Sequence, residues 1–178
     1  LIEQTGVNTL GDTNNPGENK GKPLTAKVDG GTFLSNPKLH EEIFGPFTLV
    51  VACEDAAEML AVANALDGQL TGTLVATEGD IQAHPEIVEA LSTKVGRILF
   101  NGVPTGVEVC DSMQHGGPYP ASTDQRTTSV GTAAIGRFVR PIAYQSWPDS
   151  LLPDPLKNSN PSNLWRVVNG ELTKSPIV

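Results

Sequence analysis

The chain has 178 residues, with 12 basic and 20 acidic side chains and a formal charge of −8. It therefore has the size of a single domain and lacks the positive surface that nucleic acid or an anionic membrane would require. No apolar run reaches the roughly 20 residues of a membrane helix, and the first residues have no leader pattern. The two cysteines cannot form a disulfide framework, which favours a reducing, cytoplasmic compartment. Because residue 1 is leucine, we expect a piece of a longer product.

The first part of the chain predicts little regular structure. Residues 1–22 are rich in Gly, Asn and Pro and are interpreted as a loop or a disordered lead-in. Residues 24–28 alternate weakly, and the stretch GGTFLSNP (30–37) supplies a second short strand between turn signals. We expect these two strands to form a hairpin or a sheet edge.

A regular strand and helix alternation begins at Phe47. The expected strands are 47–52, 72–77 and 97–100, and the expected helices are 55–67 and 85–95. The first helix carries a capping-box pattern and an apolar face, and the second begins with a proline. Right-handed crossovers of this length predict an α/β fold with a parallel sheet covered by helices on both sides.

The amino-acid composition changes after the last predicted strand. Residues 101–123 contain too much Gly and Pro for a regular element, and a loop at the carboxyl end of a parallel strand is a common place for a binding site. A short helix is expected within 130–138 and a further strand at 141–147, followed by an extended tail. The predicted organisation is therefore a lead-in (1–22), an α/β portion (23–140) and a strand with tail (141–178).

Several kinds of chemistry are excluded by spacing. The stretch GTAAIGR has glycines at a P-loop interval but lacks the Lys-Ser/Thr pair, and no GxGxxG is present. The three histidines have no metal-ligand spacing, so no metal site is predicted. Cys53 is interpreted as core, and Cys110 lies in the loop without a visible activating base. We therefore predict no catalytic residue in this chain.

The stretch Glu41–Pro46, EEIFGP, resembles the E-E-[IV]-F-G-P motif of the aldehyde dehydrogenase superfamily. The resemblance implies that Glu42 binds the nicotinamide ribose hydroxyls and that Phe44 packs against the nicotinamide end of NADP or NAD. A carboxylate can accept two hydrogen bonds from a vicinal diol, and an aromatic face restricts a flat ring. The alternative is a helix-end acid pair followed by a packed phenylalanine.

The stretch GRILFNGVPTGVEV and its continuation through residue 145 are similar, nearly end to end, to the α-ketoglutaric semialdehyde dehydrogenases of that superfamily, as is the tail segment LLPDPLKNSNP. The resemblance implies a three-layer catalytic-domain core and a C-terminal oligomerisation strand at 141–147. It also implies a substrate pocket contacted by Asn101, Pro104, Thr105, Gly106 and Val107.

The implied activity is the NAD(P)-dependent oxidation of α-ketoglutaric semialdehyde to α-ketoglutarate. In the superfamily, the nucleophilic cysteine, the base and the nucleotide-binding domain stand well upstream of EEIFGP. We therefore expect this chain to be a C-terminal portion that is inactive alone and that needs the N-terminal portion of the same enzyme. Homo-oligomerisation through the C-terminal strand is also expected. The alternative is a non-catalytic, truncated module that acts in subunit association.

Overall fold

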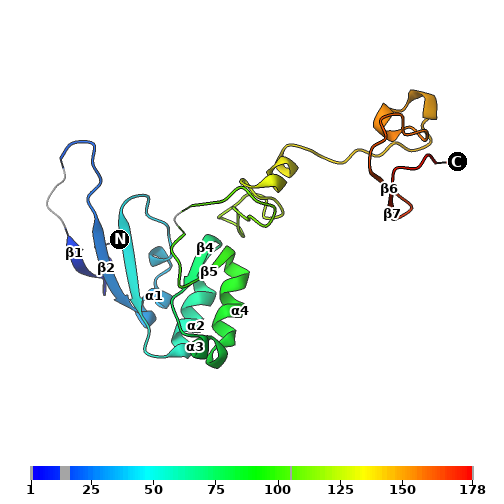
Figure 1. Cartoon of the computed structure of the whole chain (residues 1–178). Coiled ribbons are helices and arrows are strands. Elements are labelled where there is room, and N and C mark those ends of the chain that lie inside the picture. Colours follow the sequence, from blue (N-terminus) through cyan, green and yellow to red (C-terminus); the bar gives the residue numbers. More distant parts are fainter. Residues whose placement is uncertain (1, 13–16, 105, 178) are drawn as a thin grey trace. The chain divides into compact units, whose positions relative to one another are not determined.

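The structure is a computed structural model, and it describes residues 2–12, 17–104 and 106–177. Figure 1 shows the elements coloured along the chain. The chain divides into two compact units, Leu1–Val139 and Arg140–Val178. The first unit contains every α-helix of the described residues, and the second contains a small hairpin and short 3-10 turns.

The first unit begins with a three-stranded sheet of β1 (Asn8–Asp12), β2 (Leu24–Asp29) and β3 (Phe47–Ala52). Strands β2 and β3 are parallel and pair in register over their full length, whereas the sequence predicts that the first of them forms a hairpin or a sheet edge with residues 30–37. Strand β1 pairs antiparallel with β2 and corrects the expectation that the whole lead-in is a loop. The pairing comes from the free edge of β2, which a local hydrophobic pattern does not reveal.

The stretch predicted as a second short strand is instead helical, and that prediction is wrong. It forms α1 (Gly30–Ser35) and the 3-10 helix η1 (Pro37–Leu39). Asp29 caps α1 by accepting from the Thr32 backbone N–H at 2.7 Å and from the Thr32 hydroxyl at 2.8 Å. These two hydrogen bonds lower the pKa of the Asp29 carboxyl. The cap gives the Thr32 backbone N–H a hydrogen-bond acceptor within the same segment, whereas in a strand a neighbouring strand would have to supply one. The helix is therefore favoured.

The core of the first sheet lies between β2, β3 and the helices. Its fully buried members are Val28, Phe33 and Leu39, and the side chains packed against them include Leu49, Val51, Val62 and Leu66. Along β3, the residues that alternate with this core-facing set are exposed. The described residues thus cover this sheet with helices on one face, and the expected third layer is not present among them.

The second half of the unit is a parallel pair. Helix α2 (Ala56–Ala65) leads to β4 (Gln69–Leu74), and α3 (Glu78–Ala83) with α4 (Pro85–Lys94) leads to β5 (Val95–Phe100). Both longer helices confirm the sequence prediction, whereas α3 was not predicted. Strands β4 and β5 pair with each other but, among the described residues, not with the first sheet.

The capping box of α2 is offset by one residue from its usual form. Asp55 accepts from the Glu58 N–H at 2.8 Å, while the Glu58 carboxylate accepts from the Glu54 N–H at 2.7 Å. Both bonds satisfy donors at the helix start.

The segment after β5 is irregular up to η2 (Thr132–Arg137), which confirms the predicted loop and places a 3-10 turn where a short helix was expected. Its interior is held by Thr128, which is 3% exposed. The Thr128 hydroxyl accepts from the His115 N–H at 2.8 Å and donates to the Val130 carbonyl at 2.7 Å. The loop is therefore a packed structure with its own buried hydrogen bonds.

The second unit contains η3 (Asp149–Leu151), η4 (Asp154–Leu156) and the hairpin of β6 (Arg166–Val168) and β7 (Glu171–Thr173). The hairpin turn is Asn169-Gly170, with φ of 53° and 88°, which is typical of a tight two-residue connection. Asn160 is 6% exposed and its amide bonds the backbone of Leu164 and Lys174. The hairpin and this buried amide correct the expectation of an extended tail.

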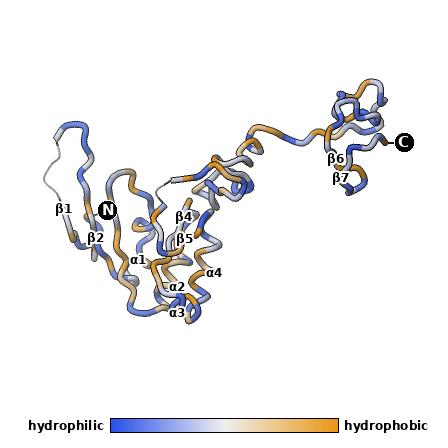
Figure 2. The backbone as a smooth tube through the Cα atoms, viewed as in Figure 1, coloured by the Kyte–Doolittle hydropathy of each residue, from blue (hydrophilic) through white to orange (hydrophobic). Residues whose placement is uncertain are grey.

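Residues 141–147, which the sequence predicts as a strand, form no strand in the structure. They are exposed throughout, and Figure 2 shows hydrophobic residues within this connection. Ile142 is 61% and Trp147 52% exposed. A strand requires a partner for its backbone groups, and the described part of this chain offers none here.

Candidate functional site

The EEIFGP segment connects η1 to β3, and its Gly-Pro pair sets the start of the parallel ladder. Gly45 has φ of +155°, which favours glycine. The Gly45 carbonyl accepts from the Phe47 N–H at 2.8 Å, and the Pro46 carbonyl accepts from the Leu24 N–H at 3.0 Å. The stiff turn therefore aligns β3 with β2 and holds the preceding side chains at the sheet edge.

His40 anchors the other end of the segment. Its ring stacks on Phe33 with 4.2 Å between centroids, and its Nε2 lies 2.9 Å from the Phe33 carbonyl oxygen, to which a protonated Nε2 donates. Because both ends are held, the acidic pair projects from a defined turn. His40 itself is a satisfied histidine, as the sequence predicts.

Glu42 is exposed and lines a cavity of about 460 Å³. The rest of the wall comes from His40, Glu41, residues 67–71 at the start of β4, and the loop residues 120–121. The cavity thus joins the motif to the start of β4. An exposed carboxylate in such a hollow can accept hydrogen bonds from a diol.

Phe44 lies in a different hollow. It is 92% exposed and lines a cavity of about 330 Å³ with Leu24, Pro46 and Phe47. The walls are mainly apolar, so this hollow suits a flat, weakly polar group. The structure therefore assigns the two residues of the motif to two separate hollows.

Asn101 is the first residue of the loop predicted to line the substrate pocket. Its side-chain oxygen accepts from the Ala76 N–H at 2.9 Å, and its amide donates to the Ala76 carbonyl at 2.8 Å. Its φ is +49°, a conformation that asparagine tolerates better than most residues. The side chain thus extends the β4–β5 pairing past the end of the strands and fixes where the loop begins.

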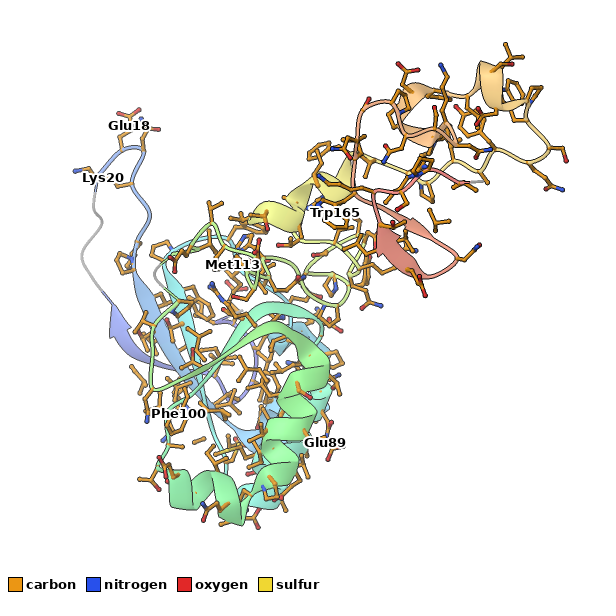
Figure 3. All side chains as sticks on the ribbon, turned by 45° about the vertical axis from the view of Figure 1, so that its right-hand side comes forward. Glu18, Lys20, Glu89, Phe100, Met113 and Trp165 are labelled. Atoms are coloured by element: carbon orange, nitrogen blue, oxygen red, sulfur yellow. The ribbon has the colours of Figure 1, made fainter. Side chains whose placement is uncertain are left out.

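The remaining loop residues Pro104, Gly106 and Val107 are exposed, and Thr105 lies outside the described residues. Arg97 on β5 contacts this loop. Its Nη1 donates to the Gly106 carbonyl at 3.3 Å and lies 3.5 Å from the Met113 sulfur, a side chain labelled in Figure 3. Sequence reasoning missed Arg97, although a charged residue inside an apolar strand is a recognisable signal.

Gly116 and Gly117 of the loop lie against the backbone of β4 and β5. A Cβ atom on Gly96 of β5 would collide with the Gly116 carbonyl group, and one on Gly117 would collide with the Gln69 carbonyl oxygen. The loop therefore returns to the starts of β4 and β5 at a distance that only glycine permits.

The two cysteines have different surroundings. Burial, followed by the charges of Glu58 and Asp55, raises the pKa of the Cys53 thiol, which opposes formation of a thiolate. Cys110 contacts the Ser112 hydroxyl at 3.5 Å. Within the described ranges, no group of three His, Cys, Asp or Glu side chains is placed to hold a metal ion, and no helix is long and apolar enough to cross a membrane.

Comparison of the sequence with known proteins gives a family match and two similar proteins. The aldehyde dehydrogenase family model matches residues 3–133. The chain is similar to an α-ketoglutaric semialdehyde dehydrogenase of Acinetobacter baylyi, with 50% identity over 155 residues, which cover 86% of this chain and 30% of that protein. It is also similar to α-ketoglutaric semialdehyde dehydrogenase 2 of Azospirillum brasilense, with 47% identity over 145 residues, which cover 82% of this chain and 28% of that protein.

The match begins before β1 and ends within η2, so it includes both parallel strand pairs, the EEIFGP turn and the loop after β5. The chain spans about 30% of the length of the relatives that it matches. Because the family model matches residues 3–133, well over half of the chain, the chain belongs to the aldehyde dehydrogenase family.

Proposed function

We propose that this chain forms the cofactor-edge and substrate-loop portion of an NAD(P)-dependent aldehyde dehydrogenase that oxidises α-ketoglutaric semialdehyde to α-ketoglutarate. The observation that carries the proposal is the 50% identity to a protein of that name over most of this chain. The exposed carboxylate of Glu42 in its cavity supplies a physical reason for a cofactor contact.

The residues present fit the nicotinamide end of the cofactor. Glu42 would accept hydrogen bonds from the ribose hydroxyls, and Phe44 would limit the ring to one plane. When bound, NADP or NAD supplies the hydride acceptor for aldehyde oxidation. The Gly45-Pro46 turn and the His40 contacts then serve to keep these two side chains in place.

The substrate side of the proposal rests on the loop after β5. Pro104, Thr105, Gly106 and Val107 would form a wall of the aldehyde pocket, while Asn101 positions that wall through Ala76. We propose that the nucleophilic cysteine comes from a part of the enzyme outside these residues, since the raised pKa of Cys53 disfavours its thiolate.

We further propose that the exposed face of β3 packs against the rest of the same cytoplasmic enzyme and completes a three-layer core. Residues 141–147 would add as a strand to the sheet of a second subunit, in a homo-oligomer. The exposure of Ile142 and Trp147 supports this assignment, because a large apolar surface in water favours association. A non-catalytic role in subunit association remains the second candidate on the same observation.

The test of the cofactor contact uses the complete enzyme with Glu42→Gln, and Glu41→Gln as the matched control. Both side chains are exposed and line the same cavity, so neither change should disturb the fold. Loss of a charge-assisted contact should raise the KM for NADP+ or NAD+ about tenfold in Glu42→Gln, with little change in the control. Equal kinetics in both variants would refute the role of Glu42.

The test of the chain's own activity is direct. The chain alone, mixed with α-ketoglutaric semialdehyde and either NADP+ or NAD+, should produce no reduced nicotinamide. Turnover that thiol alkylation abolishes would show that Cys53 or Cys110 is a nucleophile and would overturn the proposed division of labour.

A further inference from the structure

A second polar cavity lies beside the Glu42 cavity and has the opposite chemical character. Its volume is about 360 Å³, and it is lined by His115, Ser122, Thr123, Ser129 and Arg137, together with Leu70 and residues 120–121. Leu70 and residues 120–121 also line the Glu42 cavity. Where the first cavity is lined by carboxylates, this one is lined by a guanidinium, an imidazole and hydroxyl groups.

The segment that builds the cavity reverses the charge of the chain. The whole chain carries −8, yet residues 114–140 contain three arginines and only one acidic residue, Asp124. Arg126 already holds that carboxylate, with 2.9 Å from Nε to Oδ1 and 3.0 Å from Nη2 to Oδ2. Side-chain and backbone hydrogen bonds from Arg126 lower the pKa of Asp124 to about 2, and the charge of Arg137 contributes last.

Arg137 is therefore left without a carboxylate of its own. It is exposed, and among the described residues none forms a hydrogen bond or an ion pair with its guanidinium. It lies at the end of η2, next to the cavity that it lines. A guanidinium can donate up to five hydrogen bonds in a planar fork that matches a carboxylate or a phosphate.

The hydroxyl groups retain donor capacity toward the cavity. The Ser122 oxygen accepts from the Gly117 N–H at 3.1 Å, which leaves its own hydrogen to donate. The Thr123 hydroxyl forms no hydrogen bond with any described residue. Ser129 differs, because its hydroxyl already donates to the His115 carbonyl at 2.9 Å.

The His115 ring adds a further unused group. Its backbone is fixed, since its N–H donates to Thr128 and its carbonyl accepts from the Ser129 N–H at 2.9 Å. Its Nδ1 is buried and has no partner among the described residues. A buried nitrogen without a partner is uncommon in folded proteins, and a bound water or ligand is one explanation for it.

We propose that this cavity binds a small oxyanion, a carboxylate or a phosphate, through the Arg137 guanidinium and the hydroxyls of Ser122 and Thr123. The inference does not depend on the activity proposed above. It assigns an anion site to the loop, next to a cavity that is itself lined by acids.

The test is calorimetric titration of the full chain with inorganic phosphate and, separately, with malonate, each against sodium chloride at equal ionic strength. We expect saturable binding of phosphate or malonate and no such binding of chloride. The ligand with the higher affinity identifies a phosphate or a carboxylate as the natural group. Arg137→Gln should weaken binding about tenfold, because it removes a charge-assisted contact.

Arg140→Gln is the matched control. It removes the same charge at a position three residues after Arg137, and Arg140 does not line the cavity. Thr123→Val is a second test that leaves the net charge unchanged, and it should weaken binding severalfold. Binding that is equal in wild type and Arg137→Gln, or that falls equally in Arg137→Gln and Arg140→Gln, would overturn the proposal, since general charge attraction would then explain it.

Discussion

Replacing Asn101 tests whether this residue fixes the start of the substrate loop. Asn101→Ala removes the two hydrogen bonds to Ala76, at 2.9 and 2.8 Å, and places alanine at φ of +49°. Each bond contributes about 1 kcal/mol net, and the left-handed backbone costs a residue with a Cβ about 1 kcal/mol more. These contributions add to about 3 kcal/mol. Because the side chain is exposed, we expect a smaller total loss, of about 2 kcal/mol.

Two further variants separate these contributions. Asn101→Gly loses the hydrogen bonds but accepts the positive φ, so it should be less destabilised than Asn101→Ala. Asn101→Asp keeps an acceptor for the Ala76 N–H but brings a carboxylate to the Ala76 carbonyl, so it should lose about 1–2 kcal/mol.

The assay is urea unfolding of the chain followed by far-UV circular dichroism, which reports on the first unit because it contains every α-helix described. Wild-type stability in Asn101→Ala would refute the structural role, and so would a Gly variant less stable than the Ala variant.

The other predictions concern charge, close packing and a buried amide. The pKa of Asp124 should be about 2, against an ordinary 3.8, because Arg126 donates hydrogen bonds to its carboxylate. The stabilisation from this pair is therefore complete above pH 3.8 and is lost as the pH falls toward 2. A carbon-13 NMR titration of the Asp124 carboxyl measures the pKa, and Arg126→Gln should return the midpoint toward 3.8. A wild-type midpoint already at the ordinary value would contradict the pairing. Gly96→Ala should destabilise the first unit severely, by about 3 kcal/mol or more, because its Cβ collides with the Gly116 backbone; a thermal midpoint within a degree or so of wild type would show that the loop can shift freely. Asn160→Ala should destabilise the second unit by about 2–3 kcal/mol through lost buried hydrogen bonds; Trp147 and Trp165 both lie in that unit, so their fluorescence should change at lower urea while the far-UV transition stays in place.

The elements that the sequence predicts correctly are those whose information is local. Strand β3 is a nearly continuous apolar run, and α4 has proline at its start and lysine in its last turn. The EEIFGP turn is likewise recognisable from six adjacent residues. In these segments the pattern, the caps and the turn residues all favour the same structure.

Other elements had local signals that the apolar pattern obscured. The helix α3 begins with a capping box of Thr77 and Asp80, in which each side chain bonds the backbone of the other. Asp29, the last residue of β2, stands three residues before Thr32 and marks the start of a helix. The two glycines between them make this stretch resemble a turn. The Asn169-Gly170 dipeptide marks the final hairpin.

Strand β1 and the two side chains that shape the loop depend on distant partners. Arg97 reaches Gly106 and Met113, and Asn101 reaches back to Ala76. These contacts depend on how β4 and β5 are aligned in the sheet, and the spacing of residues in the sequence does not predict them. The second cavity escaped sequence reasoning for the same reason, because its groups come together only after the loop folds back on β4.

The separate pairing of β2 with β3 and of β4 with β5 has a consequence for how the chain folds. Each pair joins strands that are close in sequence, so each can form after closing only one short connection. Helix α2 follows the first pair and packs against α4 from the second. Two early nuclei can therefore arise independently and meet through these helices, and mutations at the α2–α4 contact should slow the last step of folding rather than the first.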